Sequence, residues 1–391
     1  MGYSDNIGNK FLHVFTLPTT AEAFFDGQFE FLVNNGHNIT VAANAPILPK
    51  FCERNHIKNI SLPIKRKISL FDDIKCIFAA RKIIKKGKYD TVVGHTPKGA
   101  LIAMTASMLA GTKNRVYFRH GLIYTTAHGT MRWVLKTVER ITALFSTLII
   151  NVSPSLGELA IRDYLNPASK QRVIGIGSCG GIDTQILFNP ETIKADKVTA
   201  LKKRLNISDK DFIIGFCGRL CRDKGIIELI EGFEKFKENN PNISAKLLLI
   251  GRFDTRDALP SFYQNKIKNT PDIIFTDYVE HDLLPMFYSI MDVFVFPSHR
   301  EGFGMSVIEA SAMEIPILVS RSHGCVDTIR EHQTGEYIEL TPESICNGLE
   351  IMMDTHYRQK LGKTGRNFIL ENFDYSVMWP KVLDTYNEIL K

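Results

Sequence analysis

Short apolar runs alternate with amphipathic stretches along the whole chain, and this alternation limits the possible folds more than any other feature. In the first half the runs are rich in Val, Ile and Phe. Buried strands separated by helices are typical of a parallel sheet with helices on both faces. The expected strands are Phe11–Thr16, Ile39–Ala43, Thr91–Gly94, Arg115–Phe118, Thr147–Val152 and Gln171–Ile174. The expected helices are Ala21–Asn34, Leu70–Lys86, Gly99–Leu109 and Met131–Leu144.

The same pattern starts again in the second half of the chain. The expected strands there are Phe212–Cys217, Lys246–Ile250, Ile273–Thr276, Val293–Phe296 and Ile317–Ser320. The expected helices are Gly225–Asn239, Leu283–Ser289, Met305–Met313 and Pro342–Thr355. The predicted fold class is therefore α/β, with two Rossmann-like, doubly wound domains in tandem.

A glycine-rich segment, GIGSCGGID at 175–183, separates the two halves of this pattern. We expect a first domain over residues 1–183 and a second over 184–371. The final stretch, 372–391, is amphipathic, and we expect it to form a closing helix that packs back on the first domain. Ligands of doubly wound sheets bind beyond the carboxyl ends of the strands, so we expect the binding site in the cleft between the domains.

The net charge of +6 is unevenly distributed along the chain. Residues 1–183 carry 23 Lys and Arg against 12 Asp and Glu, a net of +11, and the remainder carries 25 against 30, a net of −5. The first domain should therefore be attracted to anionic surfaces. Its basic residues concentrate at 64–88 and again around Trp133, at Arg132, Lys136 and Arg140. This pattern fits a basic amphipathic helix on an anionic membrane, or a solvated helix face.

Missing features exclude several classes of protein. The sequence contains no apolar run long enough to span a membrane and no signal peptide at its start, which favours a cytoplasmic protein. Its seven cysteines include no CxxC pair, so we expect free thiols and neither disulfides nor a zinc site. Neither HExxH nor GxxxxGK[ST] occurs, and no pair of aspartates at a strand end indicates a metal site. The run GIGSCG at 175–180 has the spacing GxGxxG, but no helix is expected after it, as a dinucleotide fold requires. No nucleic-acid-binding module is present, so we expect no nucleic-acid partner.

The segment 296–320, FPSHREGFGMSVIEASAMEIPILVS, carries the strongest signal of a binding site. A buried strand ends there, a loop with Gly302 and Gly304 follows, and a helix begins near Met305. Free backbone N–H groups at a helix start bind anionic oxygens. The Glu301 carboxylate beside them can accept hydrogen bonds from sugar hydroxyls.

Glu309 follows Glu301 after seven intervening residues and has two interpretations. Its carboxylate can be a second ligand-binding group near the start of the helix. Alternatively, Ser306 followed three residues later by Glu309 fits a capping box, in which the glutamate only stabilises the helix start. The spacing alone leaves both interpretations open.

The segment 215–233, GFCGRLCRDKGIIELIEGF, adds two cations after a strand. Arg219 can bind phosphate oxygens with its forked guanidinium, and Lys224 adds a point charge. Together they are placed to neutralise a diphosphate leaving group. A solvated basic turn is the alternative, and it is the interpretation we adopt for the neighbouring Arg222 and Asp223.

Two histidines end predicted strands, and both positions should face the predicted cleft. His95 lies in VVGHTPKGA, followed by Lys98 at a helix start, and His120 lies in YFRHGLIYT. A lone histidine is more often structural. We adopt that interpretation for three others: His13, His37 and His56.

Taken together, these residues resemble glycosyltransferase family 4, whose members have the GT-B fold. The resemblance covers nearly the whole chain and rests on three segments: GRLCRDKG at 218–225, EGFGMSVIE at 301–309 and the glycine-rich hinge at 175–183. Within the family, HTPKGA and GIGSCGGID resemble the branch that builds bacterial capsule, O-antigen and related glycans on polyprenyl-diphosphate carriers.

The resemblance implies a donor-binding second domain. Arg219 and Lys224 would bind the donor diphosphate, Glu301 the hydroxyls of the transferred sugar, and Glu309 the ribose. The turn at Tyr278-Val279 would hold the base, and the loop before the helix would also approach the donor. The implied backbone contacts lie at Val279, Gly302, Phe303, Gly304 and Met305.

The resemblance also implies an acceptor-binding first domain. His120 matches the histidine near the anomeric carbon in this family, and His95 and Lys98 are our candidates for acceptor contacts. Family members are retaining and metal-independent, so neither a cofactor nor a metal is implied. The chain departs from the family pattern in the loop after its first strand, which has only Gly27, and at Gly180, where relatives usually have Asn.

The expected function is transfer of a sugar from a nucleotide-sugar, a UDP-hexose or UDP-N-acetylhexosamine, to a lipid-linked glycan acceptor on the inner face of the cytoplasmic membrane. Positive groups would stabilise the leaving diphosphate, and a leaving oxygen would take the acceptor proton. Three alternatives stay open: a UDP-sugar epimerase, a phosphorylase with pyridoxal phosphate, and a non-catalytic nucleotide-sugar-binding protein. Donor turnover separates the last of these from an enzyme.

Overall fold

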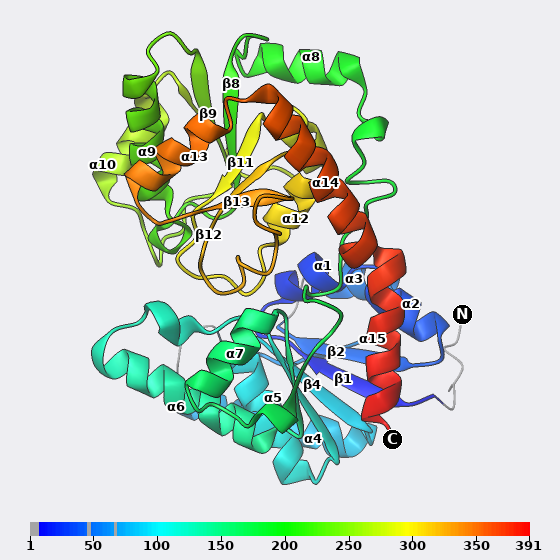
Figure 1. Cartoon of the computed structure of the whole chain (residues 1–391). Coiled ribbons are helices and arrows are strands. Elements are labelled where there is room, and N and C mark those ends of the chain that lie inside the picture. The colour runs from blue at the N-terminus through cyan, green and yellow to red at the C-terminus, as the bar shows by residue number, and fades with distance from the viewer. Residues whose placement is uncertain (1–7, 45–47, 66–68) are drawn as a thin grey trace. The chain divides into compact units, whose positions relative to one another are not determined.

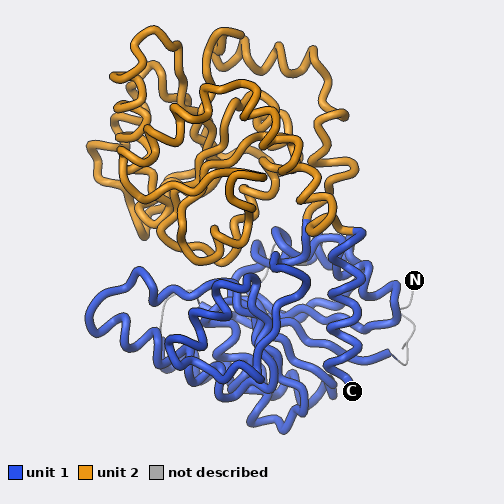
Figure 2. Tube along the Cα trace, viewed as in Figure 1, with its two compact units in different colours: residues 1–181, 376–391 blue, residues 182–375 orange. Residues whose placement is uncertain are grey.

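The computed structural model describes residues 8–44, 48–65 and 69–391, which form two compact units. Unit 1 comprises Met1–Gly181 with Ser376–Lys391, and unit 2 comprises Ile182–Tyr375 (Figure 2). The first boundary falls inside the glycine-rich segment, and the last residues of the chain rejoin unit 1. Two predictions fall partly outside the described residues: the interpretation of the chain's start at 1–7 and the basic run at 66–67.

Within the described residues, unit 1 contains a seven-stranded parallel sheet in the order β3-β2-β1-β4-β5-β6-β7 (Figure 1). The strands are β1 (Lys10–Val14), β2 (Asn38–Ala43), β3 (Lys58–Ser61), β4 (Thr91–His95), β5 (Asn114–Arg119), β6 (Leu148–Asn151) and β7 (Gln171–Val173). All but β3 were predicted. The sequence of β3 is KNIS, and its exposed side chains give no apolar run because it lies at the edge of the sheet.

The helices of unit 1 correct the sequence prediction at three places. They are α1 (Pro18–Phe25), α2 (Gln28–Asn34), α3 (Leu48–Arg54), α4 (Leu70–Gly87), α5 (Pro97–Ala110), α6 (Gly129–Phe145), α7 (Pro154–Arg162) and most of α15 (Tyr375–Ile389). The single helix predicted over Ala21–Asn34 is two helices, because Gly27 between them has a φ of 73°. Helices α3 and α7 were not predicted, although the Ser153 side chain caps α7 by accepting a hydrogen bond from the Leu156 N–H.

The two faces of this sheet are covered by different helices. One face carries Leu12, Val92 and Tyr117, which belong to a buried cluster with apolar residues of α4, α5 and α6. The other face carries rings that pack against α1, α2 and α15. His13 there lies 4.7 Å from the Phe29 ring and 5.9 Å from the Tyr386 ring, centre to centre. This second face holds the histidines discussed below.

Unit 2 contains, within the described residues, a six-stranded parallel sheet in the order β10-β9-β8-β11-β12-β13 (Figure 1). The strands are β8 (Phe212–Cys217), β9 (Ala245–Ile250), β10 (Ile273–Phe275), β11 (Val293–Phe296), β12 (Ile317–Ser320) and β13 (Gly335–Ile338). The helices are α8 (Ala195–Arg204), α9 (Ile226–Asn239), α10 (Ser261–Asn269), α11 (Leu284–Tyr288), α12 (Met305–Ala312), α13 (Pro342–Ile351) and α14 (Thr355–Phe373). The order of strands confirms a doubly wound α/β unit.

One predicted helix of unit 2 ends earlier than expected. The helix expected over Pro342–Thr355 stops at Ile351. A new helix, α14, then begins at Thr355, because the Asp354 side chain caps it by accepting hydrogen bonds from two backbone N–H groups. Strand β13 and helices α8, α10 and α14 were not predicted.

The segments that enter and leave unit 2 are tied together. The backbone N–H of Ile182 donates to the Phe373 carbonyl at 2.9 Å, and the Tyr375 N–H donates to the Ile182 carbonyl at 3.1 Å. The Thr184 hydroxyl donates to the buried Asp374 carboxylate. The chain therefore enters and leaves the unit side by side at the glycine-rich segment.

In the described part of the chain, every helix is too short or too polar to cross a membrane. All seven cysteines lie within the described residues and are free thiols.

Candidate active site

The two strongest sequence motifs form one site in unit 2. They follow the neighbouring strands β8 and β11, and their loops are in direct contact. Gly225 has a φ of 67°, and a Cβ there would lie 1.9 Å from the Pro297 carbonyl oxygen. The backbone N–H of His299 donates to the Asp223 carbonyl at 2.8 Å. Only glycine allows this approach at position 225.

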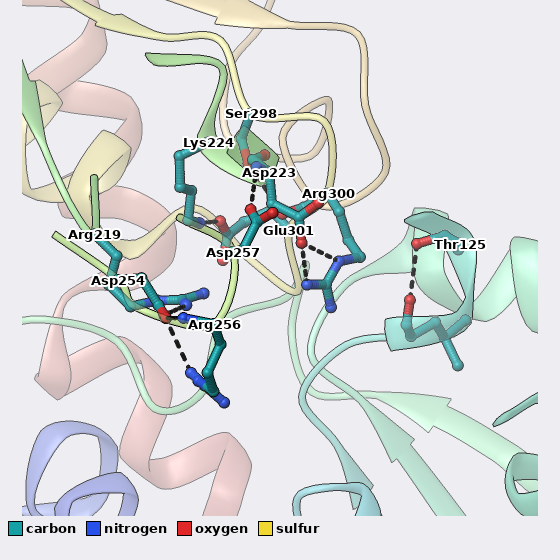
Figure 3. Close-up of polar contacts among 11 residues, drawn as sticks. Thr125, Arg219, Asp223, Lys224, Asp254, Arg256, Asp257, Ser298, Arg300 and Glu301 are labelled. Atoms are coloured by element: carbon teal, nitrogen blue, oxygen red, sulfur yellow. Dashed lines mark hydrogen bonds and ion pairs between the residues drawn. The ribbon is translucent and has the colours of Figure 1, made fainter. Parts of the chain in front are cut away.

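Arg219 follows β8 and is held by a carboxylate from the next strand. Asp254 follows β9 and forms ion pairs with Arg219 and, at 3.1 Å, with Arg256 (Figure 3). Burial alone would raise the pKa of Asp254, but hydrogen bonds from the Arg256 backbone and from both guanidinium groups lower it. The Arg219 side chain stays 50% exposed. Its guanidinium is thus fixed in place and open to a ligand.

Lys224 and Glu301 form an ion pair from the two contacting loops (Figure 3). The Lys224 ammonium also lies 5.0 Å from the centre of the Phe296 ring. Burial is the main cause that lowers the pKa of Lys224, to about 8. The carboxylate of Glu301 favours the charged form, so we expect an ammonium at pH 7. This pair places one positive and one hydrogen-bond-accepting group side by side.

Asp223 is a structural link between the loops, and its prediction as part of a solvated turn was wrong. Its carboxylate forms an ion pair with Arg300, whose Nε lies 3.2 Å away, and its carbonyl accepts a hydrogen bond from the Ser298 hydroxyl at 3.2 Å (Figure 3). Arg222 is exposed, as expected, and its Nε donates to the Ala258 carbonyl at 3.1 Å.

Glu309 is a buried acceptor, and the capping-box interpretation was wrong. Helix α12 begins at Met305 with Gly304 at its N-cap, so Ser306 lies inside the helix and no side chain caps it. The Glu309 carboxylate instead accepts hydrogen bonds from the Tyr288 hydroxyl at 2.9 Å and from His281 Nε2 at 3.3 Å. Each oxygen can accept a second hydrogen bond. The side chain is 9% exposed, which leaves a small surface for a ligand.

The loop between Glu301 and α12 is closely packed. Gly302, Phe303 and Gly304 are buried, whereas Met305 is half-buried. The Gly302 carbonyl faces Gly324, where a Cβ would lie 2.5 Å from it. This packing holds the backbone that the sequence predicted to approach the donor.

The turn that was expected to hold the base follows β10. Val279 is half-buried and Tyr278 is 51% exposed. The Arg252 guanidinium lies 4.6 Å from the centre of the Tyr278 ring and pairs with Asp277 at 3.4 Å. Arg252 therefore contacts two residues of this turn, and both of them are exposed.

Three histidines of unit 1 form a continuous chain of hydrogen bonds. His120 Nε2 lies 3.1 Å from His95 Nδ1, and His95 Nε2 lies 2.9 Å from His13 Nδ1. His95 has no exposed surface, so it reaches a ligand only through His120, which is partly exposed. A direct acceptor contact by His95, as predicted, is therefore not available.

Lys98, the second acceptor candidate, lies at the start of α5. Its ammonium forms an ion pair with Asp73 of α4 at 2.7 Å, and its side chain is 15% exposed. The pair fixes the position of Lys98 on the side of the sheet covered by α4 and α5.

Local packing explains why this chain has Gly180 where relatives usually have Asn. A Cβ at this position would lie 2.2 Å from Nε2 of Gln28, whose side chain is buried. The Gln28 amide from α2 thus fills the space that a side chain at position 180 would need.

One group of possible metal ligands occurs among the described residues: Glu331, His332 and Glu336. Their side chains already bond within the protein, since His332 Nδ1 lies 3.0 Å from Glu336 and the Tyr357 hydroxyl donates to the same carboxylate. None of them belongs to the two motifs described above.

Comparison with known proteins decides the family. The model for glycosyl transferases group 1 matches residues 197–368, and that for Glycosyltransferase Family 4 matches residues 28–178. A capsular polysaccharide biosynthesis glycosyltransferase, CapM of Staphylococcus aureus, is 31% identical over 97% of both chains. The chain belongs to glycosyltransferase family 4. It is a transferase, as the sequence predicted.

Two further relatives of this glycosyltransferase are informative. An Escherichia coli enzyme, UDP-Gal:alpha-D-GlcNAc-diphosphoundecaprenol alpha-1,3-galactosyltransferase, is 26% identical over 83% of this chain and 82% of its own. The crystal structure of Anabaena Alr3699/HepE in complex with UDP and glucose is 16% identical, covers 97% of this chain and 99% of its own, and has a TM-score of 0.79. At that identity the structural likeness shows the fold, which is GT-B as predicted.

Five side chains that contact the candidate residues or link their loops were given no such role in the sequence: Asp223, Asp254, His281, Tyr288 and Arg300. Asp254 had a usable signal, because GRFDTRD follows β9 as GRLCRDKG follows β8. Asp223 and Arg300 lie inside the two motifs, where the sequence assigned binding roles only to their neighbours. His281 and Tyr288 come from a short 3-10 helix and from α11, with no strand-end signal of their own.

Proposed function

We propose that this family 4 enzyme is a retaining, metal-independent transferase that uses a UDP-sugar as donor. The observation that supports the proposal most is the group at the carboxyl end of β8: Arg219 held by Asp254, Lys224 paired with Glu301, and buried Glu309. Two cations beside two carboxylates suit a molecule with an anionic diphosphate between two sets of hydroxyls.

In this proposal Arg219 and Lys224 take up the negative charge that develops on the diphosphate as the bond to the sugar breaks. Their positions are fixed before the donor binds, by Asp254 and Glu301, so little reorganisation is needed. Removing one such preorganised group costs about 10² to 10³ in kcat. These two cations supply the positive charge that a bound metal ion supplies in metal-dependent enzymes.

We assign the two carboxylates to hydroxyl groups at opposite ends of the donor. When the donor enters, its diphosphate competes with Glu301 for Lys224, which frees Glu301 to accept hydrogen bonds from the transferred sugar. Glu309 has acceptor capacity left beside Tyr288 and His281, and the ribose hydroxyls are its proposed ligands.

The proton of the acceptor hydroxyl needs no side-chain base in this mechanism. The acceptor attacks from the face that the diphosphate leaves, so a leaving oxygen lies next to the hydroxyl and takes its proton. In this proposal Glu301 and Glu309 accept hydrogen bonds from hydroxyl groups of the donor, and Glu309 also accepts one from Tyr288, so neither carboxylate acts as the base. His120 of unit 1 contacts the transferred sugar in this proposal.

The donor and acceptor classes are inferred from the relatives. The Escherichia coli relative is named for a UDP-Gal donor and a diphosphoundecaprenol-linked acceptor, and HepE was crystallised with UDP and glucose. We propose a UDP-hexose or UDP-N-acetylhexosamine donor and a polyprenyl-diphosphate-linked glycan acceptor, in the synthesis of a capsule or related polysaccharide.

A lipid-linked acceptor requires access to a membrane, and we propose that α4 and α6 of unit 1 supply it at the inner face of the cytoplasmic membrane. Helix α4 exposes Phe71 by 80% and Phe78 by 60%, and α6 exposes Trp133 by 68%. Basic side chains such as Lys82 and Arg132 are exposed on the same helices. Exposed apolar residues among lysines and arginines fit an interfacial helix on anionic lipids.

Vesicle flotation tests this membrane contact. The protein should float with vesicles of anionic lipid and remain behind with neutral ones, and Phe71→Ser should weaken the binding. Phe262→Ser is the matched control, because Phe262 is 61% exposed but lies on α10 of unit 2. Equal loss in both variants, or no binding to anionic vesicles, would contradict the assignment.

A panel of nucleotide-sugars tests the proposed function itself. UDP release would be measured with UDP-, GDP- and dTDP-sugars and a polyprenyl-diphosphate-linked acceptor. We expect release with one or two UDP-sugars that depends on the acceptor. Release only with another nucleotide would refute the UDP assignment, and interconversion of the donor without release would favour an epimerase.

A further inference from the structure

The three histidines of unit 1 continue into the C-terminal helix. They lie on β1, at the end of β4 and just after β5, which are neighbours in the sheet. His13 of β1 lies opposite Val93 of β4, and His95 lies two residues beyond Val93. In the same way His95 lies opposite Phe118 of β5, and His120 lies two residues beyond Phe118. Residues two apart along a strand lie on the same face, so all three histidines lie on one face of the sheet. Beyond His13, the Tyr386 hydroxyl of α15 lies 3.3 Å from His13 Nε2.

Each of the three imidazoles is neutral. Burial lowers the pKa of His13 and of His120 to about 3 and holds that of His95 well below its usual value. A neutral imidazole has one N–H donor and one acceptor nitrogen. A chain of neutral rings therefore donates in one direction throughout: either all rings donate toward His120, or all donate toward Tyr386.

Tyr386 decides this direction. Burial raises the pKa of its hydroxyl, which therefore keeps its proton. Among the described residues its hydroxyl has a hydrogen-bond contact with His13 alone, so the O–H donates to His13 Nε2. The reverse direction would leave a buried O–H without an acceptor, which is unfavourable. At the other end of the chain of rings, Nδ1 of His120 lies 3.5 Å from Sγ of Cys179. A thiol is both a weak donor and a weak acceptor of hydrogen bonds, so this contact favours neither direction.

We propose that Tyr386, His13 and His95 are positioning residues that hold His120 in a single tautomer with its proton on Nδ1. The part-exposed ring of His120 then offers a fixed donor, which exchanges the weak Cys179 contact for a hydroxyl oxygen of the transferred sugar. This last step rests on the proposed function. His120 acts as a donor and not as a base, which agrees with proton transfer to the leaving diphosphate.

Aromatic packing supports this positioning role. The His95 ring stacks on Phe15 at 4.0 Å between centres and 8° between planes, and His120 stacks on Phe118 at 5.0 Å and 28°. Phe24 of α1 covers His120 at 5.8 Å. The rings cannot turn over without displacing these neighbours, so the orientation of each nitrogen is fixed.

The tautomers can be measured in the free protein, independently of turnover. Histidine ¹⁵N–¹H correlation spectra distinguish a ring protonated at Nδ1 from one protonated at Nε2. We expect Nδ1–H in His13, His95 and His120. Tyr386→Phe should convert all three rings to mixtures, whereas Tyr89→Phe, which removes a hydroxyl bonded to Thr40 away from the chain, should leave them unchanged. A proton on Nε2 of His120, or unchanged spectra in Tyr386→Phe, would overturn the proposal.

Turnover tests whether the tautomer matters. Losing one hydrogen bond shifts a tautomer equilibrium about fivefold, so kcat of Tyr386→Phe should fall measurably but by no more than about fivefold, with donor KM changed less than about twofold. His95→Gln keeps one donor and one acceptor and should retain most activity, whereas His95→Leu should lose it. Equal activity of the two His95 variants would refute the positioning role. If the wild type transfers no sugar, the proposed function fails while the spectra still decide the tautomer.

Discussion

Replacing Arg219 by alanine should abolish most of the turnover and leave the fold intact. Arg219 comes from the loop after β8, its guanidinium is fixed by Asp254, and its side chain is half exposed. Loss of one preorganised positive group at a developing anion costs about 2.7–4 kcal/mol of transition-state stabilisation, or about 10² to 10³ in kcat. A half-exposed ion pair contributes only about 0–1 kcal/mol to folding, which shifts the melting temperature of a unit this size by at most about 4 °C.

Arg256→Ala is the matched control for this substitution. Arg256 pairs with the same carboxylate at 3.1 Å and its side chain is 56% exposed, but it does not follow β8. We expect it to change stability as little as Arg219→Ala and to keep turnover within about threefold of the wild type. The kcat of Arg219→Lys should lie between that of Arg219→Ala and that of the wild type, because an ammonium restores the charge but not the forked contact.

The assay is UDP release under saturating acceptor, with melting temperature measured on the same preparations. A loss in kcat of less than about fivefold in Arg219→Ala would refute the diphosphate assignment, since the expected loss is far larger. An equal loss in Arg256→Ala would show that disturbing Asp254, and not removing the cation, causes the effect.

Two further predictions concern stability. Gly225→Ala should destabilise unit 2 by at least about 2 kcal/mol in chemical unfolding, because a left-handed backbone is combined with a Cβ 1.9 Å from the Pro297 carbonyl, whereas Gly111→Ala, with a φ of 79° and open space, should cost about 1 kcal/mol; similar losses would contradict the contact. The hydrogen bond to Glu309 raises the pKa of His281, so its stabilising effect is complete below about pH 6.5 and declines as pH rises through the raised pKa. The difference in melting temperature between wild type and His281→Asn should therefore shrink from about pH 6 to pH 8, and a constant difference would refute this.

Most of the strands could be predicted from the sequence because they are buried apolar runs flanked by turn residues. Phe212–Cys217 and Val293–Phe296 have the predicted bounds, since both are apolar runs that end at turns. Errors occurred where a local signal was weak or misplaced. The polar edge strand β3 has no apolar pattern, and the left-handed Gly27 divides what reads as one amphipathic helix.

The site was only partly predictable, because ion pairs between loops depend on which strands become neighbours. Arg219 and Lys224 follow directly from their motif, whereas Asp254, the partner of Arg219, belongs to a loop that lies beside Arg219 only because β9 pairs with β8. His13 was interpreted as structural because it stands alone in the sequence. Its link to His95 appears only through the pairing of β1 with β4.

The anomeric configuration of the product tests the central claim most directly. The enzyme would be incubated with the UDP-sugar that supports UDP release, a lipid-linked acceptor and EDTA, and the new linkage analysed by NMR. An α-linked product from the α-configured donor, formed as fast with EDTA as without, is the result that this account predicts. A β-linked product, or a reaction that EDTA abolishes and a divalent metal restores, would contradict it.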